Sequence, residues 1–366
     1  MSGIKKTLIS SVQNNHIAHA QLFAGQNGSA SLALALAYAT YINCENKTEH
    51  DACGQCPSCL KINKLIHPDL HFIFPVNTTK TVTKDATCTT FMKDWRQFLL
   101  ENPYNTLSGW GQHIGAENKQ LNISADEARN IIKTVSLKAY EGEYKIMIMW
   151  MAEQMNVTAA NAILKILEEP PEKTVFLLIS GDLEKILPTI LSRAQVFRIP
   201  PFSDQEISSH LVNELNIEQN KAEQVAYLAD GNLNEALKLL SDLNEDNLGQ
   251  VSNWLRSCYK KDFAELISRA ESFHKLNKDS QKGFFQYSLN IIRESLVCKY
   301  ASEDFLRLKE EDLNFIVNFS KILDHHKIDK LNKEFNEASF HLERNASPKI
   351  VFLDVSLSVS SILHGN

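Results

Sequence analysis

The chain is poor in residues that interrupt regular structure, and it has no long apolar run. Only 13 of its 366 residues are glycine and 10 are proline, which argues against a fibrous or disordered chain. No stretch of 18 apolar residues occurs, so we predict no contact with a membrane. The first 13 residues lack the apolar core and small-residue cleavage site of a signal peptide. We therefore expect a cytoplasmic protein.

Positive charge is also scarce. The chain has 38 Lys and Arg against 44 Asp and Glu, a formal net charge of -6. Proteins that bind nucleic acid alone concentrate positive charge, so we expect any DNA contact to be local and shared with partners. At this length the chain is expected to form two or three domains.

Strands and helices alternate along residues 1–200. The apolar segments Ala20–Ala24, Lys145–Met151 and Thr174–Ser180 are predicted buried strands, and a helical pattern follows the first of them over Ser31–Tyr41. Such alternation gives right-handed parallel connections and a helix-covered sheet. We therefore predict an α/β domain built on a parallel sheet.

Residues 76–122 interrupt this alternation. They are polar and irregular, with Trp95 and Phe98 on a possible helix, and we interpret them as an insertion whose role the sequence does not reveal. Order returns at Ser124, a predicted N-cap with Glu127 as its capping-box partner for a helix over Ala125–Ser136.

Only helical periodicity follows residue 200. We predict a small helical lid domain over residues 201–245 and an all-α domain over residues 246–366. The fold class is therefore α/β plus all-α.

Several motifs, taken in order, resemble the delta-prime subunits of bacterial DNA polymerase III clamp loaders. They are HAQLFAG (His19–Gly25), a cysteine set, HPD (His67–Asp69), TAANAILKILEEPP (Thr158–Pro171) and Ser192-Arg193. The resemblance implies an AAA+ domain of the P-loop type with a zinc module at residues 44–59, a helical lid and a C-terminal collar. It also implies partners: ATPase subunits of the gamma/tau type, a delta-type subunit and, through the complex, the sliding clamp and primed DNA.

The phosphate loop has lost the residues that bind phosphate. A working loop reads G-x-x-x-x-G-K-[ST], because its Lys neutralises phosphates and its hydroxyl ligates magnesium. Counted from Gly25, the Lys position is Ser31 and the hydroxyl position is Leu32, and no Lys or Arg occurs in residues 7–46. The loop retains Gly28, but without a cation we predict that this chain binds no ATP.

Three further positions, in two other motifs, lack the expected charges. By the resemblance, the strand-end acidic residues correspond to Trp150 and Met151, and the nucleotide-sensing Arg of the lid corresponds to Asn234. The nearest carboxylate, Glu153, lies beyond the strand end, where we expect it to point to solvent. Two alternatives remain open, namely a divergent ATPase that uses Glu153 and a stand-alone zinc-containing protein that binds nucleic acid.

Four cysteines have the spacing of a zinc site. The pattern C-x8-C-x2-C-x2-C comprises Cys44, Cys53, Cys56 and Cys59. A disulfide framework is the alternative, but a reducing cytosol disfavours it. Four thiolates close the coordination sphere, so we predict a structural zinc ion.

Arg193 is the one catalytic candidate. The resemblance implies that it acts in trans, as an arginine finger on ATP held by a neighbouring subunit. A guanidinium suits that role because its planar fork offers several donors to a phosphoryl group. The alternative is an ordinary ion pair with a carboxylate such as Asp182 or Glu184.

Overall fold

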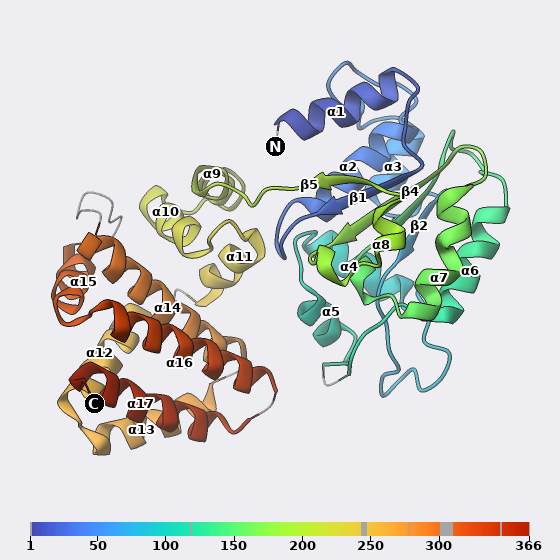
Figure 1. Cartoon of the computed structure of the whole chain (residues 1–366). Coiled ribbons are helices and arrows are strands. Elements are labelled where there is room, and N and C mark those ends of the chain that lie inside the picture. Colours follow the sequence, from blue (N-terminus) through green and yellow to red (C-terminus); the bar gives the residue numbers. More distant parts are fainter. Residues whose placement is uncertain are drawn as a thin grey trace. The chain divides into compact units, whose positions relative to one another are not determined.

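The computed structural model describes residues 2–117, 119–242, 247–276, 278–300, 310–344 and 346–365. The chain divides into two compact units: residues 1–210 with 229–235 form the first, and residues 211–228 with 236–366 form the second (Figure 1). The boundary predicted between residues 245 and 246 lies outside the described residues. Within the described ranges, no helix has both the length and the apolar content needed to cross a membrane.

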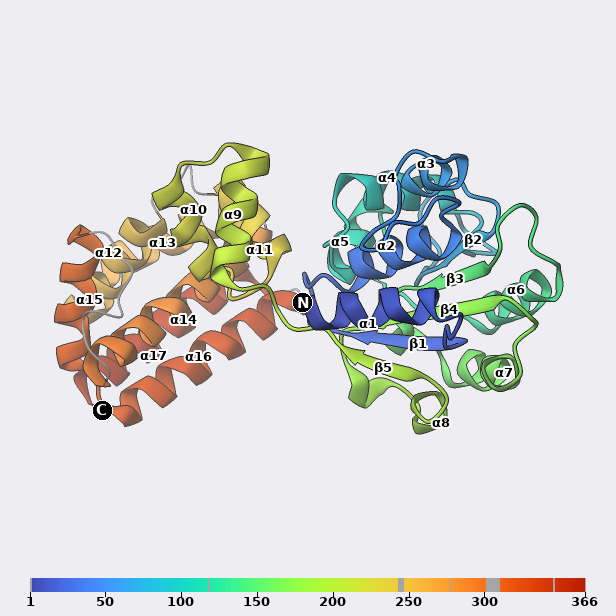
Figure 2. The ribbon, with the colours of Figure 1, turned by 90° about the horizontal axis from the view of Figure 1, so that it is seen from above.

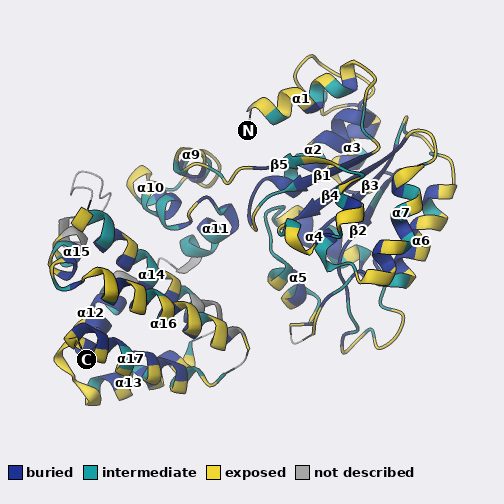
Figure 3. Cartoon of the chain, in the orientation of Figure 1, coloured by how far each residue is buried: buried dark blue, intermediate teal, exposed yellow. Residues whose placement is uncertain are grey.

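The first unit is built on a five-stranded parallel sheet of order β2-β3-β4-β1-β5. Its strands are β1 Ala20–Ala24, β2 Leu70–Ile73, β3 Lys145–Met149, β4 Thr174–Ser180 and β5 Gln195–Arg198. The two central strands β3 and β4 are buried along their whole lengths (Figure 3), which explains their nearly continuous apolar sequences. The predicted parallel α/β domain is confirmed.

Helices cover both faces of this sheet. They are α1 Ser2–Gln13, α2 Ser31–Asn43, α3 Pro57–Asn63, α4 Met92–Glu101, α5 Leu107–His113, α6 Ala125–Ser136, α7 Val157–Glu168 and α8 Pro188–Leu191, with short 3-10 turns at Ala152–Gln154 and Leu183–Lys185. Helix α2 packs on β1, β3 and β4, and α6 packs along α7. Figures 1 and 2 show α2 and α7 on opposite sides of the sheet.

The start of α6 shows how the sequence places a helix. Ser124 is the N-cap, and its hydroxyl accepts a hydrogen bond from the Glu127 backbone N–H at 3.3 Å. The Glu127 side chain does not close the predicted capping box. Its carboxylate instead accepts a hydrogen bond from the Cys88 backbone N–H at 2.9 Å, and so ties the insertion to the sheet domain.

Helix α4 confirms the helix predicted around Trp95 and Phe98. Both side chains are buried, and the helix supplies an aromatic face that packs on the edge of the main core. The insertion is therefore a folded part of the first unit.

The second unit is entirely helical among its described residues. Its helices are α10 Gln219–Leu228, α12 Asn247–Lys260, α13 Phe263–Lys275, α14 Lys278–Tyr300, α15 Glu310–Ile322, α16 His325–Glu343 and α17 Pro348–His364. Helices α9 Asp204–Leu215 and α11 Leu233–Asp242 cross between the two units. Trp254 is fully buried at the centre of the core, and its indole N–H donates to the Ser356 hydroxyl at 2.8 Å. The predicted all-α region is confirmed.

Candidate functional site

Three hydrogen bonds hold the loop after β1. The Gly25 N–H donates to the Ser180 carbonyl at 3.1 Å, and the Ser29 N–H donates to the Gln26 carbonyl at 3.1 Å. The hydroxyls of Ser29 and Ser31 are 2.9 Å apart and hydrogen-bonded. Ser31, at the Lys position of a working loop, is buried and faces its own loop. Leu32 is buried as well.

Gly28 is required by its conformation and by its neighbour. Its φ of +75° lies in the left-handed region, and a Cβ on it would lie 1.7 Å from Asn232 Oδ1. The Gly28 carbonyl also accepts a hydrogen bond from the Leu233 N–H at 3.2 Å. Backbone from residues 229–235 therefore closes directly onto the loop.

The space left at this loop is about 20 Å³. That is close to the room needed by a single water molecule, whereas small-molecule pockets are about 300 to 1,000 Å³. The lining residues include Gly25, Gly28, Ser31, Leu32, Trp150 and Met151, with Pro103, Tyr104 and Asn105 from the insertion. The predicted residues of the degenerate nucleotide site at the loop and the strand end therefore lie together, but protein atoms already fill most of the space between them. Residues 103–105 of the insertion also line this site, which the sequence did not indicate.

The end of β3 holds no exposed acid. Trp150 and Met151 are 2% and 6% exposed, so both are core residues at the positions where the resemblance expects metal chemistry. The expectation that Glu153 points to solvent is wrong: its Oε1 accepts a hydrogen bond from the Gly181 N–H at 3.0 Å, and its Oε2 is buried without a hydrogen-bond partner among the described residues. Burial raises the pKa of this carboxyl because water no longer solvates its charge.

Asn234, at the position of the sensing Arg, is also buried. Its Oδ1 accepts a hydrogen bond from Asn102 Nδ2 at 3.1 Å. At the position where the resemblance expects a nucleotide-sensing Arg, a neutral amide therefore pairs with an amide of the insertion.

The four predicted cysteine ligands lie together. Their sulfur atoms are all within 4.8 Å of one another, and all four thiols are free. Tetrahedral zinc with Zn–S bonds of about 2.3 Å requires sulfurs about 3.8 Å apart, and Cys53 Sγ and Cys59 Sγ are 4.0 Å apart. The cluster can therefore hold a metal ion.

Backbone donors favour the thiolate at Cys53, whereas burial raises the pKa of Cys44 and of Cys59. The N–H of Cys53 donates to Cys44 Sγ at 3.3 Å, and the N–H of Cys56 donates to Cys53 Sγ at 3.3 Å. The backbone N–H groups of Gln55 and Cys56 lower the pKa of Cys53 to about 6. Such donors stabilise the charged form that a metal ion binds.

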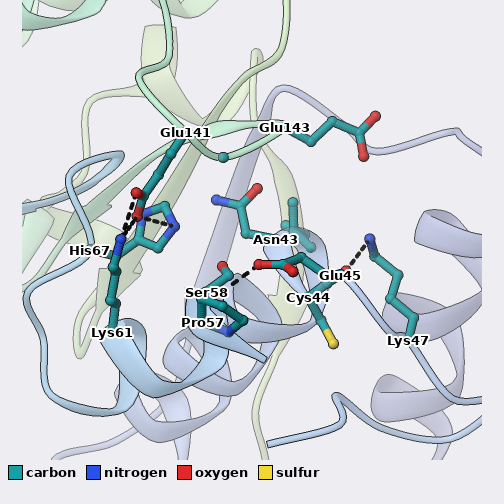
Figure 4. A pocket seen from close by; sticks show the side chains of 12 residues that line it. Asn43, Cys44, Glu45, Lys47, Pro57, Ser58, Lys61, His67, Glu141 and Glu143 are labelled. Atoms are coloured by element: carbon teal, nitrogen blue, oxygen red, sulfur yellow. Dashed lines mark hydrogen bonds and ion pairs between the residues drawn. The ribbon is translucent and has the colours of Figure 1, made fainter. Parts of the chain in front are cut away.

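A polar cavity of about 460 Å³ lies beside this module (Figure 4). Lys61 and Glu141 form an ion pair at 2.6 Å on its wall, close to His67. The ring of His67 is buried, and its Nδ1 accepts from the Asp69 N–H at 3.1 Å, so Nε2 carries the hydrogen. Glu45, Glu143 and Lys47 also line the cavity, so its charged side chains are three acids and two bases.

The HPD motif has a structural role in this turn. The carboxylate of Asp69 accepts hydrogen bonds from the backbone N–H groups of Tyr140, Glu141 and Gly142 at 2.5, 2.8 and 2.7 Å. Burial acts to raise the pKa of Asp69, but these three donors outweigh it and the pKa falls below its ordinary value. The motif thus fixes the turn that leads into β3.

Arg193 forms an ion pair, but with neither expected carboxylate. Its Nε donates to Glu168 Oε1 at 2.6 Å, its Nη2 donates to the same oxygen, and its Nη1 donates to the Thr189 carbonyl at 2.7 Å. Asp182 pairs with Lys185 instead, at 3.0 Å. The Arg193 side chain remains 30% exposed. Glu168, the first acid of LEEPP at the end of α7, therefore holds this guanidinium at the surface.

The strand, glycine loop and helix at the start of a parallel sheet have the order of the P-loop-type α/β class, and an all-α part follows the sheet. The model of the family described as DNA polymerase III, delta subunit, matches residues 2–203, which is more than half of the chain. The chain belongs to this bacterial clamp loader family.

Individual relatives include two types of subunit. The chain is 27% identical to DNA polymerase III subunit tau of Bacillus subtilis strain 168 over 65% of this chain and 35% of that protein. It is 27% identical to subunit delta' of the same organism over 64% of this chain and 58% of that protein. It is 32% identical to subunit delta' of Pseudomonas aeruginosa PAO1 over 48% of this chain and 41% of that protein. In each case the alignment spans less than two thirds of the relative's length.

Proposed function

We propose that this chain is a non-catalytic, delta-prime-type subunit of a bacterial DNA polymerase III clamp loader. The tau and delta' relatives from Bacillus subtilis have the same sequence identity to this chain. The assignment to one subunit type or the other therefore depends on the nucleotide site. That site supports a subunit without ATP, because Ser31, Leu32, Trp150 and Met151 replace its charged residues and only about 20 Å³ remains open. The proposed partners are gamma/tau-type and delta-type subunits, and through them the sliding clamp and primed DNA.

Its proposed contribution to hydrolysis is Arg193 in trans. The guanidinium is partly exposed and is held by Glu168, so it is ordered at the surface before any neighbour binds. A bidentate Arg suits the charge that spreads over a transferred phosphoryl group. The proposed cofactor is one structural zinc ion on Cys44, Cys53, Cys56 and Cys59.

The experiment is reconstitution of the ring with sister subunits, followed by DNA- and clamp-stimulated ATPase measurements. We expect Arg193→Ala to assemble normally and to lower hydrolysis at the adjacent site by about 10³-fold or more. The matched control is Glu168→Gln, which removes the intramolecular ion pair but keeps the guanidinium. Equal losses in the two variants would show a structural Arg193, and normal hydrolysis in Arg193→Ala would exclude the finger.

The absence of nucleotide binding is tested separately on the purified chain. We expect calorimetric titration with magnesium and ATP to give no binding, or binding only in the millimolar range. Micromolar affinity at the Gly25–Leu32 loop would contradict the proposal and would favour the divergent ATPase.

A further inference from the structure

The insertion is fixed to the sheet domain through Trp150, which lies where the resemblance expects a magnesium ligand. Trp150 packs against Trp95 of α4 with ring centroids 5.1 Å apart, and Trp95 in turn stacks on Phe74 at 4.3 Å. Phe98 and Trp110 complete this aromatic cluster at 5.1 Å from each other. All five rings are at most 4% exposed. An acidic residue in place of Trp150 would remove the ring that joins this cluster to the end of β3.

The chain leaving α4 then enters the vacated nucleotide site. Pro103, Tyr104 and Asn105 line the remaining 20 Å³ together with the degenerate loop. The Asn102 side chain accepts a hydrogen bond from the Tyr104 N–H at 2.9 Å, which shapes the turn. The remaining volume is far below the about 300 to 1,000 Å³ of typical small-molecule pockets.

The same segment contacts the lid motif, residues 229–235. Asn102 donates to Asn234 at 3.1 Å, and the Tyr104 ring meets Phe202 edge-on at 5.7 Å. Phe202 connects to the motif because its N–H donates to the Gly231 carbonyl at 3.1 Å. Insertion, degenerate loop and lid motif therefore converge on one site.

We infer that residues 102–105 of the insertion are a built-in occupant of this site and fasten residues 229–235 onto the degenerate loop. The segment lines the space beside the direct contact between residues 229–235 and the loop. The inference rests on the proposed function only in treating the site as one that holds no nucleotide.

Hydrogen exchange followed by mass spectrometry tests the inference on the full chain without nucleotide. The variant Asn102→Ala/Tyr104→Ala removes the amide hydrogen bond and the aromatic contact to the lid motif. We expect peptides covering residues 229–235 to exchange about tenfold faster or more, as the loss of these two contacts implies. Peptides from β3 and β4 should keep their protection. Leu100→Ala is the control, because Leu100 lies in the last turn of α4, two residues before Asn102, but is 57% exposed, and it should change neither region.

Unchanged exchange at residues 229–235, with β3 and β4 still protected, would overturn the inference. If the double variant also loses protection in β3 and β4, the milder single variant Asn102→Ala tests the inference instead. It should accelerate exchange at residues 229–235 by about fivefold, and no acceleration would overturn the inference. Because nucleotide is absent throughout, this result is independent of whether the chain binds ATP.

Discussion

Replacing Trp150 by Asp would restore a carboxylate at the strand end where the resemblance expects a magnesium ligand. We expect this change to destabilise the first unit and to create no magnesium site. Trp150 is 2% exposed and contacts Trp95 and Phe98 at ring-centroid distances of 5.1 and 6.3 Å. Truncating a buried Trp costs about 3 to 5 kcal/mol, and a buried carboxylate without a partner adds to this cost.

A total of about 4 kcal/mol or more corresponds to about a thousandfold faster exchange of amides that open with the unit. The assay is hydrogen exchange in the central strand β3, with α17 of the second unit as an internal reference. The control is Val157→Asp, which adds the same charge at a side chain that is 65% exposed; its effect should stay within about 0.5 kcal/mol. A loss below about 1 kcal/mol in Trp150→Asp, or tight magnesium binding by it, would refute this account of the aromatic cluster.

Three further outcomes are expected. The purified chain should carry one zinc ion by elemental analysis, and Cys56→Ser should weaken its retention; metal-free protein whose four clustered cysteines react freely with a thiol reagent would contradict this. Asp69→Asn should cost about 2 to 3 kcal/mol at pH 7, because three N–H donors lose a charged acceptor. The pKa of Asp69 is lowered in the folded protein, so the stability that its carboxylate contributes is present above about pH 4 and is lost as the pH falls below about 4. Urea titrations of the wild type and of Asp69→Asn should therefore approach the same free energy of unfolding at low pH. Burial raises the pKa of Glu294 to about 7, so the stability of the second unit should fall as the pH rises from about 4.5 to 7. At pH 8 the Glu294→Gln variant should be up to about 3 kcal/mol more stable than the wild type. Parallel pH profiles of stability for the two proteins would exclude this.

Elements with a local signal were predictable from the sequence. Strands Ala20–Ala24 and Thr174–Ser180 and helix Ala125–Ser136 have the predicted bounds, because apolar runs and an N-cap are encoded within a few residues. The cysteine cluster was also predictable, since its spacing alone brings the four sulfurs together. Boundaries were less accurate where an apolar run continues beyond its strand: β3 ends at Met149, and Met151 turns away with a φ of +54°.

The contacts that decide the state of the nucleotide site had no local signal. Nothing in the sequence around Pro103 and Tyr104 indicates that they fill a loop some 75 residues earlier, because that contact depends on how Trp95 docks on Trp150. The partner of Arg193 was missed for the same reason. Glu168 and Arg193 are 25 residues apart, and only the packing of α7 near α8 brings them together.

The aromatic cluster also restricts how this sequence can change over evolutionary time. Trp150 supports the insertion, and by our inference residues 102–105 of the insertion fill the space that a nucleotide would need. A lineage that regained only an acidic residue here would pass through an unstable protein, and one that lost only the insertion would expose a large apolar surface. Single substitutions are therefore poor routes back to ATP binding, and the two features are expected to be kept or lost as a pair.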